Sequence, residues 1–148
     1  MKTYSLTAVI AMALCAAACG NSNPPPPPEQ TGQACTAASE CFSGIDGAAL
    51  QGGAAVCLDR VPGGYCTHFC SMNSHCCAVP GECRTSYPQV CAPFESTGNM
   101  YCFLSCEDRD LADAGVVDAD AFCATYAWVG FKCRSTGGGS QNRKVCVP

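Results

Sequence analysis

Residues 65–91 read YCTHFCSMNSHCCAVPGECRTSYPQVC, and this stretch decides the kind of fold that the chain adopts. Looser copies of its cysteine pattern precede and follow it. Its six cysteines are Cys66, Cys70, Cys76, Cys77, Cys83 and Cys91. Such density is typical of a small domain that disulfides hold together in place of a large apolar core. We therefore predict that the stretch is the middle unit of a disulfide-linked repeat.

The composition of the whole chain supports this prediction. Cysteine accounts for 16 of the 148 residues, a share above that which marks a disulfide scaffold in a secreted chain. Only 14% of the residues are charged, and no basic cluster accompanies the net charge of −4, so nucleic acid is not expected as a partner. We predict a small disulfide-rich fold of irregular loops, short β-hairpins and one short helix, arranged in two or three repeat units.

The N-terminus predicts the compartment. Residues 1–18 carry one charge, at Lys2, followed by an apolar run that is shorter than the roughly 20 residues needed to span a bilayer. This pattern is typical of a secretory signal peptide, and the alanines at 16–18 supply small residues for cleavage. Secretion would place the cysteines in an oxidising compartment, where disulfides form and persist.

The sequence Ala-Ala-Ala-Cys at 16–19 resembles the lipobox of bacterial lipoproteins. The resemblance implies that Cys19 is acylated, becomes the mature N-terminus and binds the lipid bilayer through its acyl chains. Cys15 follows a bulky leucine and fits the lipobox less well. Gly20, where the family's inner-membrane retention signal is typically aspartate, implies the outer membrane, on its periplasmic or its extracellular face. The alternative is an ordinary secreted protein with Cys19 free or paired.

Five consecutive prolines occupy residues 24–28. Such a run favours polyproline II, a stiff helix that rises about 3.1 Å per residue. We interpret residues 19–34 as a lipidated N-terminus and a proline-rich tether that holds the body away from the membrane. The alternative is a proline-rich peptide ligand for a partner that the sequence does not reveal.

Recurring cysteine motifs divide the rest of the chain into three units, A (35–69), B (70–105) and C (106–148). Their starting cysteines lie 35 and 36 residues apart, and a Val-Cys pair recurs in each unit. The fourteen cysteines predicted to form disulfides are Cys35, Cys41, Cys57 and Cys66 in A; Cys70, Cys76, Cys77, Cys83, Cys91 and Cys102 in B; and Cys106, Cys123, Cys133 and Cys146 in C. Cys66 and Cys102, each preceded by a tyrosine, could instead belong to the following unit. The counts would then be three, six and five, so that bridges would cross between units. The sequence leaves both groupings open.

The alternation of GYC-x3-C-S-x4-C and Val-Cys elements resembles cysteine-rich repeat lipoproteins of Gram-negative bacteria. This resemblance implies that disulfides cross-link the chain, and it does not point to a particular chemical activity. The spacing around unit B also resembles the inhibitor cystine knot, which implies bridges from Cys66 to Cys77, from Cys70 to Cys83 and from Cys76 to Cys91.

Local signals predict short elements in unit C. Asp118 is a candidate N-cap for a helix over 118–127. Residues 131–135 and 143–147 are predicted to pair as a hairpin. The aromatic residues expected at the apolar centre of this unit are Tyr126, Trp128 and Phe131.

Three patterns in the sequence concern possible chemical sites. The two histidines, His68 and His75, lie among cysteines in an arrangement that suits zinc, but oxidation to disulfides competes for the same sulfurs. The acidic segment 107–120 contains calcium-type ligands without the EF-hand spacing, and a solvated insertion is favoured. No catalytic motif is present. We therefore predict no catalytic residue, no metal site and no cofactor.

These features together predict a membrane-anchored, disulfide-stabilised recognition or structural module at the bacterial surface or in the periplasm. It is expected to be non-catalytic and to bind a protein or glycan ligand with its rigid loops. The alternative is a knottin-like inhibitor of a hydrolase, which would present residues 78–82 or 84–90 to the enzyme.

Overall fold

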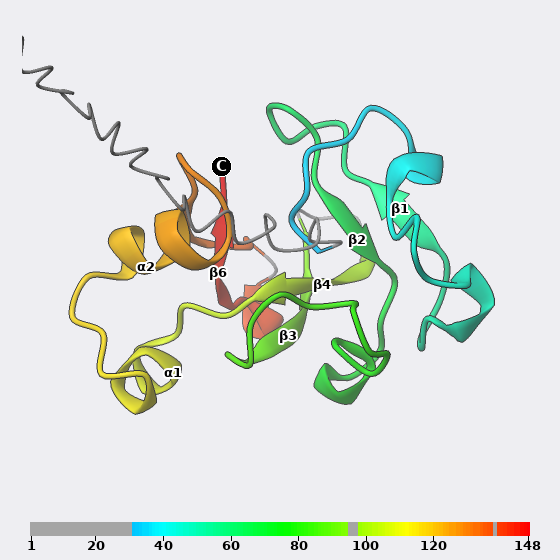
Figure 1. Cartoon of the computed structure of the whole chain (residues 1–148). Coiled ribbons are helices and arrows are strands. Elements are labelled where there is room, and N and C mark those ends of the chain that lie inside the picture. The colour runs from blue at the N-terminus through cyan, green and yellow to red at the C-terminus, as the bar shows by residue number, and fades with distance from the viewer. Residues whose placement is uncertain (1–30, 95–97, 138) are drawn as a thin grey trace, which may run out of the picture.

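The computed structural model describes residues 31–94, 98–137 and 139–148. The predicted signal peptide, Cys19 and the five prolines lie outside these residues. In the part of the chain that is described, no helix has the length and apolar character needed to cross a membrane. Short antiparallel hairpins, short helices and irregular loops make up the fold (Figure 1). Together with seven disulfides, they confirm the predicted small disulfide-rich fold.

Three two-stranded hairpins form the framework. The strand pairs are β1 (Ala55–Cys57) with β2 (Cys66–His68), β3 (Gln89–Pro93) with β4 (Met100–Leu104), and β5 (Lys132–Ser135) with β6 (Lys144–Val147). The helices are α1 (Asp108–Asp113) and α2 (Ala119–Tyr126), and the 3-10 turns are η1 (Ala38–Glu40), η2 (Gly47–Ala49), η3 (Asn73–His75) and η5 (Gly139–Gln141). Each hairpin is too short to be stable in water on its own.

Disulfides attach each hairpin to the chain that precedes it. The strand register places two cysteines directly opposite each other in every hairpin: Cys57 and Cys66, Cys91 and Cys102, Cys133 and Cys146. In each unit, the cysteine on the first strand of the hairpin bonds to the unit's first cysteine. The cysteine on the second strand bonds to the unit's second cysteine. The bridges are Cys35–Cys57 and Cys41–Cys66, Cys70–Cys91 and Cys76–Cys102, and Cys106–Cys133 and Cys123–Cys146. All bridges stay within the groups of four, six and four cysteines.

The cystine-knot pairing predicted for unit B is wrong. Cys77 bonds to Cys83 and Cys66 bonds to Cys41, so Cys66 does not reach Cys77. Cys76 bonds to Cys102, which lies outside the six cysteines of the knot pattern. The physical reason is the β3–β4 register, because it presents two adjacent sulfurs to the preceding segment and thereby selects the partners. The inhibitor interpretation loses its main support with this pairing.

The predicted helix of unit C is confirmed as α2. The Asp118 carboxylate accepts hydrogen bonds from the backbone N–H groups of Asp120 and Ala121, both at 3.0 Å, and so caps the helix. The predicted hairpin is β5 with β6, each beginning one residue after its predicted start. Helix α1, within the acidic segment, was not predicted.

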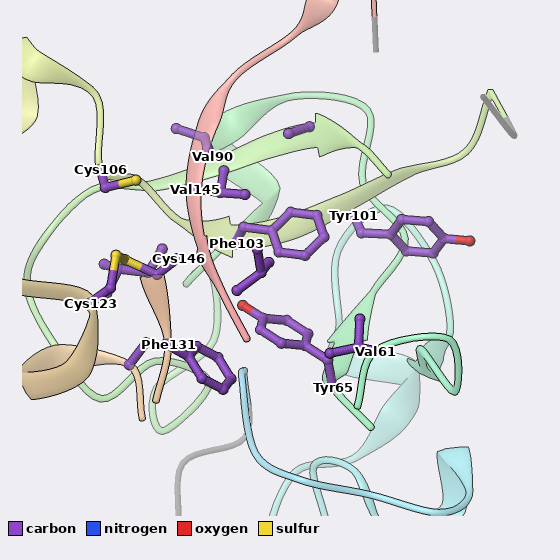
Figure 2. Close-up of a cluster of buried hydrophobic side chains, with 14 of the residues drawn as sticks. Val61, Tyr65, Val90, Tyr101, Phe103, Cys106, Cys123, Phe131, Val145 and Cys146 are labelled. Atoms are coloured by element: carbon purple, nitrogen blue, oxygen red, sulfur yellow. A yellow bond between two sulfur atoms is a disulfide. The ribbon is translucent and has the colours of Figure 1, made fainter. Parts of the chain in front are cut away.

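The three units share one apolar core, whereas the sequence predicted units that disulfides hold together in place of a core. Tyr65 of unit A lies between Phe103 of β4 and Phe131 of unit C, with ring centroids 5.1 and 5.8 Å away (Figure 2). Val145 of β6 is fully buried in the same cluster. Isolated bridges from Phe69 to Tyr101 and from Ser105 to Val145 also join neighbouring hairpins. The units therefore stabilise one another through packing as well as through their own disulfides.

The prediction for the aromatic residues of unit C is partly wrong. Phe131 is buried and Tyr126 packs against the shared core, but Trp128 remains 51% exposed. Phe131 stacks on Tyr65 of unit A, so unit C has no separate apolar centre for Trp128 to fill. Trp128 instead lies on a surface turn after α2, where Phe131 N–H donates to its carbonyl oxygen.

Candidate functional site

The cysteines considered as zinc ligands all belong to disulfides. Their bridges are Cys41–Cys66, Cys70–Cys91, Cys76–Cys102 and Cys77–Cys83. A metal binds the thiolate form of cysteine, which a disulfide does not provide. His68 contacts Glu82. His75 lies in the turn η3, and its Nδ1 is 3.4 Å from the backbone nitrogen of Ser71. The described residues therefore do not support the zinc interpretation.

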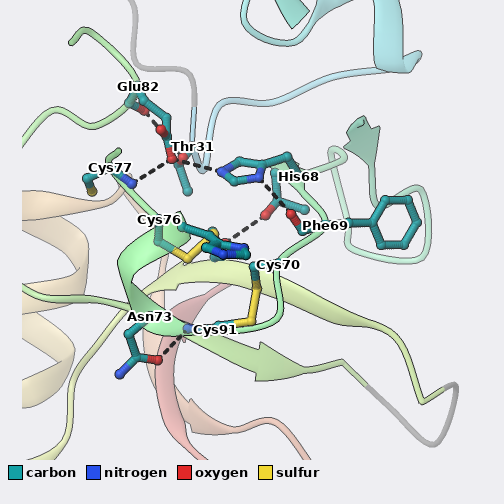
Figure 3. Close-up of a disulfide and its surroundings, with 12 residues drawn as sticks. Thr31, His68, Phe69, Cys70, Asn73, Cys76, Cys77, Glu82 and Cys91 are labelled. Atoms are coloured by element: carbon teal, nitrogen blue, oxygen red, sulfur yellow. Dashed lines mark hydrogen bonds and ion pairs between the residues drawn. A yellow bond between two sulfur atoms is a disulfide. The ribbon is translucent and has the colours of Figure 1, made fainter. Parts of the chain in front are cut away.

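A buried histidine–glutamate pair lies in unit B, where the sequence offered a candidate metal site. The side chains of His68, on β2, and Glu82, in the loop closed by Cys77–Cys83, are fully buried. His68 Nε2 lies 2.8 Å from Glu82 Oε1, and Nδ1 lies 2.9 Å from the Phe69 carbonyl oxygen (Figure 3). Both ring nitrogens of His68 therefore have an oxygen partner, as a buried imidazole requires.

Backbone amides complete the surroundings of the Glu82 carboxylate. The N–H of Cys77 donates to Oε1 at 2.6 Å, and the N–H of Val79 donates to Oε2 at 3.0 Å. Burial by itself raises the pKa of Glu82, but the hydrogen bonds from His68, Cys77 and Val79 outweigh it and hold that pKa below its ordinary value. The carboxylate is thus enclosed and ionised, so it holds the loop in place and has no access to a substrate.

The sequence did not single out this cluster. From the sequence, Glu82 was only the last residue of the segment 78–82, which a hydrolase inhibitor would present to its enzyme. The structure shows the opposite orientation, because Glu82 points inward and its carbonyl oxygen accepts a hydrogen bond from the Thr31 hydroxyl at 3.3 Å. A carboxylate in a short loop between two cysteines was the only available signal.

The acidic segment 107–120 is largely exposed to solvent, as expected of a solvated insertion, but several of its carboxylates also bond to the protein. Arg143 forms two hydrogen bonds with the Glu107 carboxylate, one of them at 2.9 Å from Nη2 to Oε2, and they lower the pKa of Glu107. Asp118 caps α2, and Asp120 Oδ1 accepts from the backbone N–H of Cys133 at 2.9 Å. Because these carboxylates serve different partners, they do not converge on a calcium ion.

A surface trough between units B and C brings aromatic and hydroxyl groups together. It has a volume of about 540 Å³ and is lined by Arg84, Thr85, Ser86, Tyr87, Thr125 and Tyr126, which we term the tyrosine trough. One wall is the segment between Cys83 and β3, and the other is the last turn of α2. The trough is shallow and open to solvent, so it suits a ligand that lies along the surface of the protein.

Aromatic packing fixes the two tyrosines. The Tyr87 ring lies edge-to-face with both Tyr126 and Phe122, at centroid distances of 4.7 and 5.1 Å. Phe122 is buried in the shared core, so it anchors both tyrosines to the rigid part of the molecule. A hydrogen bond with Tyr126, together with burial, raises the pKa of Tyr87. The Tyr87 phenol therefore stays neutral at physiological pH.

The polar groups of the trough are suited to recognition. Thr125 donates its hydroxyl hydrogen to the Ala121 carbonyl oxygen at 2.8 Å, which leaves lone pairs of the same oxygen as acceptors. The guanidinium of Arg84 reaches the Ala127 carbonyl oxygen at 3.5 Å and bridges the two walls. Aromatic surfaces beside hydroxyl and guanidinium groups match a ligand that has both apolar faces and polar edges. The lining residues do not include a nucleophile beside a general base.

The chain matches no protein-family model, no curated protein and no solved structure among those compared. The likeness to cysteine-rich repeat lipoproteins therefore remains a prediction from the sequence. The function has to be inferred from the geometry of the described residues.

Proposed function

We propose that the protein is a membrane-anchored, non-catalytic recognition module of the bacterial envelope and that its tyrosine trough binds a protein or glycan ligand. Acyl chains on Cys19 would hold the body at the outer membrane, on the periplasmic or the extracellular side. A purely structural role is the alternative. The observation that carries the proposal is the position of Tyr87 and Tyr126 at the joint of two cross-linked units.

The rigidity of the framework supports a recognition role. Binding a ligand requires side chains and loops to lose conformational freedom, and each immobilised side chain costs about 0.5–1.5 kcal/mol. Cys83, at one end of the trough wall, is held by a disulfide, and α2 is held by its Asp118 cap and by Cys123–Cys146. The trough is therefore organised before the ligand arrives.

The anchor can be tested by intact mass spectrometry of protein from a Gram-negative host. We expect cleavage before Cys19, acyl chains on that residue, and a mass about 14 Da below that of the reduced chain, because each of the seven bridges removes two hydrogens. A Cys19→Ser variant should lack the lipid and appear in the soluble fraction. Retention of that variant in membranes to the same extent as the wild type would contradict the anchor.

Replacing Tyr126 with alanine should reduce ligand capture about ten-fold, since a central aromatic side chain typically contributes 1.4 kcal/mol or more to binding. The measurement is capture from envelope and extracellular fractions on immobilised protein, with bound proteins and glycans quantified separately. Tyr126→Phe keeps the ring and should retain most of the binding.

The matched control is Val117→Ala, on the loop between α1 and α2, because Val117 is an exposed apolar side chain outside the trough. Equal capture by Tyr126→Ala and Val117→Ala would place the ligand elsewhere on the body. Capture of nothing by the wild type, with an unchanged envelope after gene deletion, would contradict the recognition role itself.

A further inference from the structure

A second hollow lies beside the point where the described chain begins. It has a volume of about 190 Å³ and is lined by Gly32, Ala34, Pro62, Gly63, Gly64, Trp128, Val129, Gly130, Phe131 and Pro148, which we term the tryptophan groove. Its walls come from the start of unit A, from the turn before β2 and from the turn after α2. None of the lining side chains is charged.

The groove holds two of the four large apolar side chains that are exposed among the described residues. Trp128 is 51% exposed and Val129 is 84% exposed, and they are adjacent in the chain. The other large exposed apolar residues, Met72 and Val117, do not line this groove. A large aromatic side chain left in solvent next to a second apolar one commonly marks a binding surface.

The size and lining of the groove narrow the choice of occupant. Sites for drug-sized ligands usually have volumes of about 300–1,000 Å³, so the groove suits an occupant that inserts only one or two rings. Grooves that combine an aromatic ring with small residues are the sites where polyproline II segments dock, because a proline ring lies flat on the aromatic face. The lining side chains carry no charge, which also suits an uncharged segment.

We propose that the tryptophan groove binds the five prolines at 24–28 of the same chain. Gly32 lines the groove and lies four residues after Pro28, a separation that an extended chain spans in about 13 Å. Thr31 and Gly32 form a turn, with a φ of +90° at Gly32, so the chain changes direction beside the groove.

Intramolecular docking requires only a weak contact. A segment joined by a short linker has an effective concentration in the millimolar range, so a millimolar affinity is enough for substantial occupancy. Proline has a fixed φ and loses little conformational entropy on docking. The proline run would then be a ligand for its own body, which combines the two interpretations that the sequence left open.

One consequence rests on the proposed lipid anchor. With the prolines docked, only residues 20–23 separate Cys19 from the groove, and the trough would be held at a constant orientation to the bilayer. The docking itself does not depend on acylation, so it can be tested without the lipid.

Trp128 is the only tryptophan in the chain, so its fluorescence reports directly on the groove. The full secreted chain with Cys19→Ser is compared with the same chain in which residues 24–28 are replaced by glycine and serine. We expect the variant to show red-shifted emission and an acrylamide quenching constant about two-fold larger, because the tryptophan face loses its cover. Adding a free pentaproline peptide at millimolar concentration should reverse both changes.

The control is Val117→Ser, which should leave emission and quenching unchanged, and an unaltered far-ultraviolet circular dichroism spectrum checks the fold of each variant. Equal quenching with and without the prolines overturns the proposal. Protection that grows with protein concentration would assign the groove to a second copy of the chain, and protection that requires phospholipid vesicles would assign it to a lipid surface. Either result also overturns the proposal, and none of these outcomes bears on ligand capture by the trough.

Discussion

Replacing Glu82 with alanine is expected to lower the free energy of unfolding by about 3–5 kcal/mol, because it leaves several enclosed polar groups without their partner, each at a cost of about 1–3 kcal/mol. The substitution leaves His68 Nε2 without its carboxylate partner in a fully buried position. It also leaves the N–H groups of Cys77 and Val79 without their acceptor. Urea denaturation of the oxidised protein, followed by circular dichroism, measures the change.

The effect of this substitution should depend on pH. The folded pKa of Glu82 is below its ordinary value of 4.5, so the carboxylate stabilises the fold above that pH and the contribution is lost as the pH falls through the folded pKa. The difference in unfolding free energy between wild type and Glu82→Ala should therefore be largest near neutral pH and shrink below about pH 4.5. A difference that grows on acidification would show that Glu82 is not ionised in the folded protein.

Glu40→Ala provides a matched control for Glu82→Ala. The Glu40 carboxylate also accepts two hydrogen bonds, from the backbone N–H and the hydroxyl of Thr36, both at 2.7 Å, but it is exposed to solvent. Water replaces the lost partner at Glu40, so we expect only a small loss there. Similar losses at the two positions would contradict the role assigned to burial.

Removing the Cys123–Cys146 disulfide with a pair of alanines is expected to cost more than removing Cys35–Cys57 in the same way. The two bridges span 23 and 22 residues, so the chain-entropy model gives each about 3 kcal/mol. Cys123 and Cys146 are fully buried in the shared core, whereas Cys57 is partly exposed. Loss of the buried sulfurs should add about 1–2 kcal/mol through a cavity.

The measurement is the free energy of unfolding of each double variant, with intact mass confirming six remaining bridges. Because the loop lengths match, the difference between the variants compares burial in the shared core with burial in the smaller cluster of unit A that holds Cys35. Equal losses would mean that the three units are held mainly by their own disulfides, as the sequence predicted. Thermal unfolding in two separate transitions for either variant would point to the same conclusion.

The secondary-structure elements whose formation depends on residues close to them in the sequence were predictable. Asp118 marks the start of α2 because an aspartate side chain reaches the amides two and three residues ahead of it. Strands β5 and β6 follow from two runs of strand-forming residues around a glycine-rich turn. Helix α1 was missed because its support comes from distant groups, among them Arg143, which pairs with Glu107 at its N-cap.

By itself, the sequence determined the class of fold, the oxidised state expected of its fourteen body cysteines and the extent of the short elements in unit C. These depend on composition and on contacts between residues a few positions apart. Only the tertiary structure decided which cysteines pair, which aromatic side chain is left in solvent and where Glu82 points. Those outcomes depend on β-strand register and on packing between segments far apart in the chain. Spacing along one unit does not specify them, because several pairings and several burial patterns satisfy the same local signals.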